Sequence, residues 1–117
     1  QEIEGDKVNM ITYFDNLNTM NGKMEAYVND TLVSTMQIKN SILEGEFKVY
    51  YPSGKLLYIM NAKNGVLNGT AKSFYESGKI MSIGHFKDGE SDGEFIEYDE
   101  KGKIIEKVLY KNGKIVK

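Results

Sequence analysis

The sequence predicts an all-β fold, an elongated antiparallel meander of tandem 24-residue β-hairpin repeats that forms a single-layer twisted sheet. Two observations lead to this prediction. Glycines recur at a spacing of 24 residues, and short runs of β-branched and aromatic residues stand between them. Twelve glycines against one proline in 117 residues indicate many tight turns that join short strands. A chain of this length forms one domain.

Three columns of glycine define the repeat, and each column has a member in each of the last three units. The three members of a column lie 24 residues apart, with no insertion between them. The glycine columns consist of Gly45, Gly69 and Gly93, of Gly54, Gly78 and Gly102, and of Gly65, Gly89 and Gly113.

The same period extends toward the N-terminus in degenerate form. Asp30 and Ser41 replace two of the glycines, and an ungapped alignment places Tyr27 over Tyr51. The whole chain, residues 1–117, therefore reads as a single repeat domain. Its parts are a half repeat at 8–20, a degenerate repeat at 21–44, and clear repeats at 45–68, 69–92 and 93–117.

Each clear unit contains two strands and two turns. The glycine at the end of the first turn, Gly54 in the first clear unit, supplies the positive φ that a bulged hairpin needs. The second turn is Asn64-Gly65 or its equivalent, the strongest short signal for a tight β-turn. The predicted first strands are 45–51, 69–75 and 93–99, and the predicted second strands are 56–62, 80–86 and 104–110.

Alternation along the second strand predicts an apolar face. Leu56, Met60 and Ala62 are an even number of residues apart, so strict alternation places them on one side of the sheet. Their equivalents in the other units are also mostly apolar, which predicts that this whole face is apolar.

Aromatic residues of the first strands form the one pattern that suggests a binding surface. Tyr50, Phe74 and Tyr98 stack on one face of the predicted sheet, with Tyr51 and Tyr75 adjacent on the other. A single-layer sheet cannot bury both faces, so an exposed aromatic stripe would mark a surface for a protein partner or a second copy. The alternative is that these aromatics only stabilise the sheet through cross-strand pairs.

Composition and spacing argue against several classes of function. The net charge of −2 and the even mixture of Lys with Asp and Glu disfavour nucleic acid as a partner. The chain has no cysteine, and its only histidine, His85, cannot form a two-histidine metal site. A weak calcium site at Glu90, Asp92 and Glu94 is conceivable, although no EF-hand loop is present. No catalytic residue, cofactor site or metal site is therefore predicted, and the chain is expected not to be an enzyme.

The repeat pattern resembles a known family. Gly45, Tyr50-Tyr51, Gly54-Lys55 and Lys63-Asn64-Gly65, with their equivalents in the next two units, resemble the MORN repeat. The closest resemblance is to the bacterial MORN-repeat variant family of YwqK-type antitoxin-like proteins. This resemblance implies a single-layer hairpin array used for protein contacts, sometimes linked to membrane association.

MORN repeats also occur beside the catalytic domain of phosphatidylinositol phosphate kinases. A kinase function would not transfer here, because the sequence has no Gly-rich phosphate loop leading into a helix. We therefore expect a non-catalytic protein-binding or scaffolding module, with a protein partner or self-association. Two alternatives stay open: an antitoxin or immunity protein that neutralises a partner, and a cell-envelope or membrane-associated module.

The compartment is not fixed by the sequence. The polar start, Gln1 to Lys7, is typical of a region just after a signal-peptide cleavage site, which slightly favours an exported or periplasmic protein over a cytoplasmic one.

Overall fold

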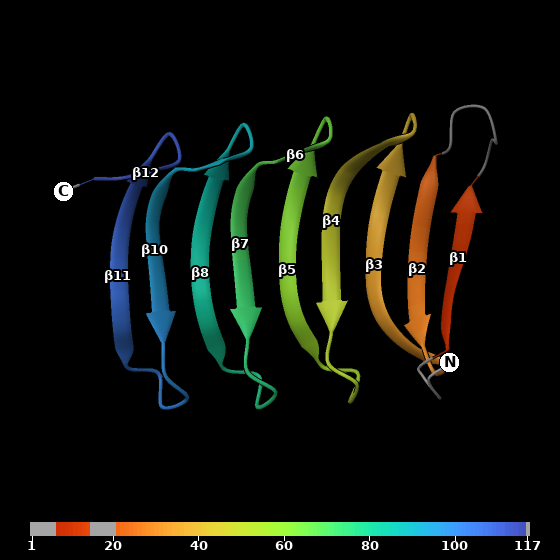
Figure 1. The fold of residues 1–117 in the computed structure, drawn as a ribbon, viewed down its shortest axis with the longest axis horizontal. Helices are drawn as coiled ribbons and strands as arrows, with labels where there is room; N and C mark the ends of the chain where they lie inside the picture. The colour runs from red at the N-terminus through yellow and green to blue at the C-terminus, as the bar shows by residue number, and fades with distance from the viewer. Residues whose placement is uncertain (1–6, 15–20, 117) are drawn as a thin grey trace, which may run out of the picture.

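The computed structural model describes residues 7–14 and 21–116, and within these residues the chain forms one curved antiparallel sheet without a helix (Figure 1). Every long strand pairs with the strands before and after it along the chain, so the sheet is a meander, as predicted. The strands are β1 (Val8–Phe14), β2 (Gly22–Val28), β3 (Thr31–Lys39), β4 (Ile42–Tyr50), β5 (Leu56–Lys63), β6 (Val66–Leu67), β7 (Gly69–Phe74), β8 (Ile80–Lys87), β9 (Glu90–Ser91), β10 (Gly93–Tyr98), β11 (Ile104–Lys111) and β12 (Lys114–Ile115).

Three of these strands are two-residue segments that fold back on the strand before them. β6, β9 and β12 pair with the ends of β5, β8 and β11. The first residue of the next long strand is then a glycine of positive φ, Gly69 at 99° in β7 and Gly93 at 106° in β10. The half repeat predicted at 8–20 is described only in its first part, where β1 pairs with β2, and residues 15–20 lie outside the described residues.

The turns between the two strands of each clear unit are bulged hairpin turns closed by glycine. In the first clear unit Gly54 N–H donates to the Tyr51 carbonyl and Tyr51 N–H donates to the Lys55 carbonyl, each at 2.8 Å. Gly54 has a φ of 91°, a conformation that costs little without a Cβ. The same two hydrogen bonds recur at the equivalent positions of the next two units.

The turns between units are two-residue turns with both central residues at positive φ. Asn64 has a φ of 52° and Gly65 has a φ of 85°, as a type I′ hairpin requires. In the degenerate region Asn40 and Ser41 adopt φ values of 51° and 64°. The turn therefore survives without glycine, with Asn at the first position, where left-handed backbone is tolerated.

Successive inter-unit turns are joined to one another by hydrogen bonds. Gly65 N–H donates to the Leu43 carbonyl at 2.9 Å, and a side-chain oxygen of Glu44 accepts from Asn64 N–H at 2.9 Å. The backbone bond recurs from Gly89 to Leu67 and from Gly113 to Ser91, at 2.8 Å in each case. The turns thus form a ladder along one rim of the sheet, which orders each unit against the previous one.

A β-bulge recurs at the same position in every unit and corrects the predicted faces. The register places Val49 opposite Tyr58 but Tyr50 opposite Leu56, so Leu57 is an inserted residue. Equivalent shifts occur in the β2–β3, β7–β8 and β10–β11 pairs. The prediction that Leu56 shares a face with Met60 and Ala62 is therefore wrong, because the inserted residue breaks the alternation between them.

The turn of the β2–β3 hairpin is also one residue shorter than the turns of the β4–β5, β7–β8 and β10–β11 hairpins. Tyr27 lies opposite Leu32, as Tyr50 lies opposite Leu56, so Tyr27 is the structural equivalent of Tyr50. The ungapped alignment of Tyr27 with Tyr51 is wrong at this point. The turn at Asn29 has two central residues, with Val28 paired to Thr31, and this removes one position from the loop.

The sheet has almost no closed core. Among the described residues, Ala62 and Ala71, each 5% exposed, are the only buried apolar side chains, and no large side chain is fully buried. The radius of gyration is 16.7 Å, against about 13 Å expected for a compact chain of this length. Stability therefore depends on cross-strand pairs and turns rather than on a packed interior.

We expect Gly78→Ala to lower the free energy of unfolding by about 1–2 kcal/mol, because φ at this residue is 94° and an L side chain there is strained. No atom lies within 4 Å of the added Cβ, so the loss would come from the backbone alone. Urea unfolding followed by circular dichroism measures it. Glu76→Ala in the same exposed turn is the control, and equal midpoints for the two variants would contradict the assignment.

Candidate functional site

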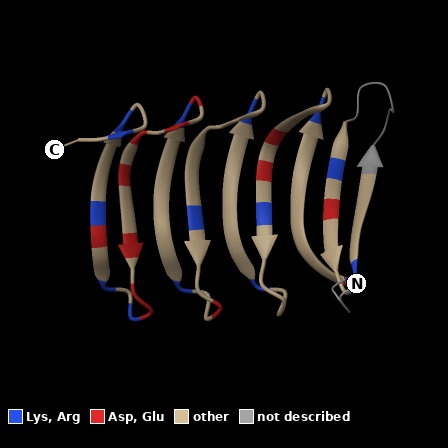
Figure 2. Cartoon of the chain, in the orientation of Figure 1, with Lys and Arg blue, Asp and Glu red and all other residues tan. Residues whose placement is uncertain are grey.

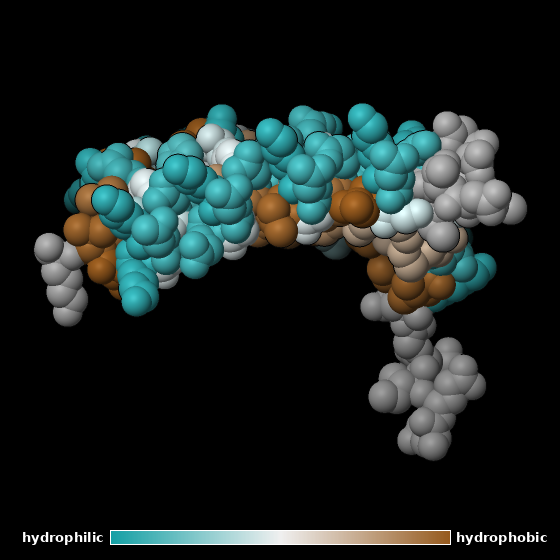
Figure 3. Space-filling view, turned by 90° about the horizontal axis from the view of Figure 1, so that it is seen from above, coloured by the Kyte–Doolittle hydropathy of each residue, from teal (hydrophilic) through white to brown (hydrophobic). Residues whose placement is uncertain are grey.

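The two faces of the sheet differ in burial. Residues that lie directly opposite each other on paired strands share a face, so the register assigns Ala62, Ala71, Ser73 and Gly84 to one side. These four are also the buried residues of the described chain. Figure 3 shows the layer bent into an arch. Since bending crowds side chains on the inner side, we assign this face to the concave side and the opposite face to the convex side.

The aromatic stripe predicted from the sequence lies on the convex face. Tyr50, Phe74 and Tyr98 occupy equivalent register positions, and each is half-buried. Each aromatic lies directly opposite an aliphatic residue, so the stripe alternates aromatic and aliphatic side chains. Those aliphatic partners are Leu56, Ile80 and Ile104, and the last is 49% exposed.

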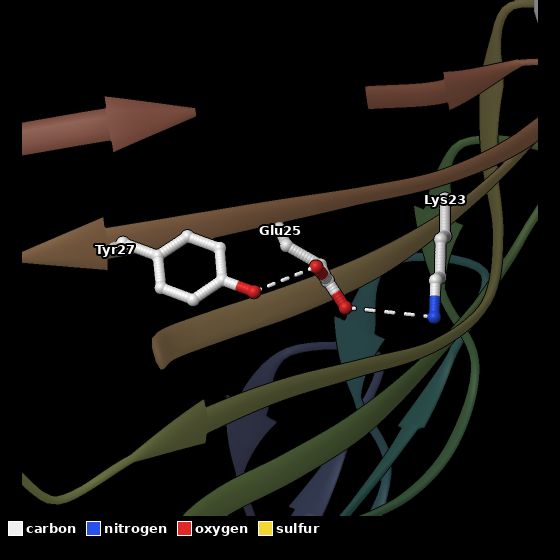
Figure 4. A network of polar contacts seen from close by, with 3 residues as sticks. All are labelled: Lys23, Glu25 and Tyr27. Atoms are coloured by element: carbon white, nitrogen blue, oxygen red, sulfur yellow. Dashed lines mark hydrogen bonds and ion pairs between the residues drawn. The ribbon is translucent and has the colours of Figure 1, made fainter. Parts of the chain in front are cut away.

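Tyr27 extends this stripe by one unit, which the ungapped alignment did not show. Its hydroxyl donates to Glu25 Oε1 at 2.8 Å, and Glu25 Oε2 lies 3.5 Å from Lys23 Nζ. The three residues alternate along β2, so they lie in line on one face (Figure 4). The convex stripe, defined here as Tyr27, Tyr50, Phe74 and Tyr98 with their aliphatic partners, thus begins in the degenerate unit.

Tyr51 and Tyr75 connect neighbouring units through their hydroxyl groups. The Tyr51 hydroxyl donates to the Phe74 carbonyl at 2.6 Å, and the Tyr75 hydroxyl donates to the Tyr98 carbonyl at 2.8 Å. Each tyrosine therefore ties its own turn to the first strand of the next unit. In the last unit Asp99 takes this position, and its carboxylate accepts hydrogen bonds from its own turn.

The raised pKa of Tyr75 favours the protonated hydroxyl that donates the hydrogen bond between units. Desolvation, with the nearby carboxylates of Glu100 and Asp99, raises the pKa of Tyr75 above its usual value of 10.0. The hydroxyl therefore keeps its proton over a wider pH range and remains a donor to the Tyr98 carbonyl.

The concave face has a hollow of about 190 Å³ over the second and third clear units. Its floor includes Ala71 and Gly84, which lie directly opposite each other on β7 and β8. Aromatic rings from three different units surround it, namely Tyr58, Phe86, Phe95 and Tyr110. The sequence alone does not reveal this hollow, because its walls come from residues up to 52 positions apart that share a face only through the register.

The hollow exists because the middle unit departs from the repeat. At the two positions occupied by Ala71 and Gly84, the flanking units carry Phe47 with Met60, and Phe95 with Val108. The two large pairs are therefore separated by a pair whose only side-chain atom is the Ala71 methyl carbon. The Phe95 ring leans into the space, since its Cδ1 would lie 3.1 Å from a Cβ added to Gly84.

A pair of carboxylates borders the hollow on the same face. Ser82, which lines the hollow, lies opposite Glu97 on β10, and Glu97 lies opposite Glu106 on β11. Figure 2 shows acidic residues along β10, the turn after it and β11. The three ion pairs of the described residues involve other side chains, so neither carboxylate has a cationic partner among them.

The two outer strands of the sheet differ in charge. At the two β11 positions that would pair with a further unit stand Glu106 and Lys107, where β5 has Tyr58 and Ile59. Charged side chains on an outer strand discourage further pairing. β1, in contrast, has no charged residue between Val8 and Phe14.

The residues considered for chemistry do not converge. His85 is exposed, with Nδ1 at 3.2 Å from Thr70 Oγ1. Within the described part of the chain, no three His, Cys, Asp or Glu side chains are close enough to hold a metal ion. No helix of the described residues is long and apolar enough to cross a membrane.

Comparison with protein families agrees with this architecture. The MORN repeat variant model matches residues 43–64, 67–88 and 91–112, which together make up more than half of the chain. The chain therefore belongs to the MORN repeat variant family. No curated protein and no solved structure matches it.

We expect Tyr75→Phe to lower the free energy of unfolding by about 1 kcal/mol, because it leaves the Tyr98 carbonyl without its donor. Tyr50→Phe is the matched control, since no hydrogen bond joins the Tyr50 hydroxyl to another described residue. Chemical denaturation of the two variants side by side measures the difference. If both variants unfold at the same denaturant concentration, the bond between units contributes nothing to stability.

Proposed function

We propose that this protein is a non-catalytic module that binds another protein. The observation that carries the proposal is the near absence of a core. Among the described residues no large side chain is fully buried, so apolar groups on both faces of the layer remain in contact with solvent. Exposed apolar surface of this extent is typical of interaction sites, and repeat arrays present it over an extended area.

The convex stripe is the surface that we propose for the partner. It combines rigid aromatic rings with partly exposed aliphatic side chains, the composition that interface centres favour. Tyr50, Phe74 and Tyr98 remain in it. Tyr51 and Tyr75 do not, because their hydroxyls bind the next unit.

Affinity capture with two matched variants tests this proposal. Ile104 belongs to the convex stripe and is 49% exposed, whereas Ile115 lies in β12, off the stripe, and is 57% exposed. We expect a cellular protein to be retained by the wild-type chain and by Ile115→Lys, and to be lost with Ile104→Lys. Equal retention by all three would reject the stripe as the binding surface.

The same experiment separates the scaffold from an antitoxin or immunity protein. Under the antitoxin hypothesis the retained protein inhibits growth when expressed alone, and coexpression of this chain restores growth. A retained protein that is harmless by itself would support a scaffold instead.

Self-association through β1 is a second candidate, because this outer strand has no charged residue and pairs regularly with β2 along its length. Such strands are templates for a second chain. We expect the mass measured by light scattering to rise with concentration, and Met10→Lys to abolish the rise. Met10 is 58% exposed, so its replacement spares the fold. A constant monomer mass for the wild type would eliminate this candidate.

A further inference from the structure

We propose that the concave hollow binds an extended peptide of a partner protein that carries an aromatic side chain followed two residues later by Lys or Arg. The site lies on the face opposite the convex stripe, so it is independent of the partner surface proposed above. It consists of the hollow over Ala71 and Gly84 and of the carboxylate pair Glu97 and Glu106.

The repeat itself shows what size of group the hollow accepts. A phenylalanine stands at the position of Ala71 in both flanking units, as Phe47 and Phe95. The sheet therefore accommodates an aromatic ring at this place, and the middle unit omits it. Since Tyr58, Phe95 and Tyr110 line the hollow from its sides, an entering ring finds edge-to-face and stacked partners.

The carboxylate pair specifies the charge of the ligand. Like charges directly opposite each other on paired strands destabilise a sheet, so Glu97 and Glu106 oppose folding. The other clear units have Val49 with Tyr58, and Ser73 with Ser82, at these positions. The scaffold does not need carboxylates there. A cationic side chain placed between them offsets their repulsion, which supplies charge complementarity.

The spacing of the two features matches an extended peptide. The hollow and the carboxylate pair lie in neighbouring rows of one face: Ala71 and Gly84 form one row on β7 and β8, and Ser82, Glu97 and Glu106 form the next row on β8, β10 and β11. Two residues of a strand span about 7 Å. Side chains two apart in an extended peptide also share a face and have this separation. A peptide lying along β8 therefore places its ring in the hollow and its Lys or Arg over Ser82, one strand spacing, about 4.8 Å, from Glu97, which a long cationic side chain can reach.

The test uses a capped heptapeptide, Gly-Ser-Phe-Ser-Arg-Ser-Gly, titrated into the isotope-labelled full chain and followed by amide resonances. We expect saturable shifts at Ala71, Gly84 and Glu97. Replacing Arg by Gln in the peptide weakens binding about fivefold, in a salt-dependent manner. Replacing Phe by Ala abolishes the saturable shifts. Absence of shifts at about 5 mM peptide, or equal binding of all three peptides, would overturn the proposal.

Two variants of the protein separate the contributions of shape and charge. Ala71→Phe restores the residue of the flanking units, so we expect it to keep or raise stability while it fills the hollow and abolishes binding. The double variant Glu97→Gln, Glu106→Gln should raise the free energy of unfolding. It should also lower the affinity for the Arg peptide to that for the Gln peptide. Glu46→Gln is the control, because Glu46 alternates with Phe47 and so lies on the convex face, does not line the hollow, and pairs with Lys48 at 3.4 Å.

The outcomes distinguish this site from the binding function proposed above. Suppose that Ile104→Lys abolishes capture of the cellular partner but the peptide shifts no amide resonance on the concave face. The proposed protein-binding function then stands, and the peptide site is overturned. Full peptide binding by Ala71→Phe overturns it as well. If Ala71→Phe does not fold, the double glutamine variant still decides, since it relieves a repulsion and fills no space.

Discussion

Hydrogen bonding between neighbouring strands is the interaction on which the whole structure depends. A single layer offers each strand two neighbours and no second sheet, so it cannot gain the burial that stabilises an ordinary domain. The described chain compensates through its turns. Left-handed residues close each hairpin turn among the described residues, and bonds such as Gly65 N–H to the Leu43 carbonyl join one turn to the next. The hydroxyls of Tyr51 and Tyr75 do the same on the other rim.

This dependence explains why the turn glycines recur in all three clear units and why departures on the faces are informative. A hairpin that contacts only its neighbours tolerates few changes in its turns, whereas its faces are free to vary. The strongest departures gather on one face of two adjacent units, at Ala71 and Gly84 and at Glu97 and Glu106. The first pair removes contacts and the second adds repulsion, so neither helps the sheet. The flanking units serve as an internal reference that shows what the scaffold would otherwise carry.

The sequence predicted the period, the strand pairs and the glycine turns correctly because these follow from local backbone chemistry. The predictions from the sequence were wrong where an inserted or missing residue shifts the two-residue alternation of side chains or the alignment between units. The bulge at Leu57 moves Leu56 to the face of Tyr50, and the shorter turn after Tyr27 changes which tyrosine it replaces. Both errors have one cause. Strict alternation and ungapped alignment assume a constant register, and a bulge is set by hydrogen bonding between two strands that a single strand does not reveal.

By itself, the sequence determined the all-β class, the 24-residue unit and the positions of the turns, because φ > 0 at Gly54 or Asn64-Gly65 is a property of those residues alone. Only the tertiary structure decided which side chains share a face. It alone brings Tyr58, Gly84 and Tyr110 around one hollow, since their meeting depends on curvature and register across several strands. Curvature arises from the joint packing of many residues, and no local pattern encodes it.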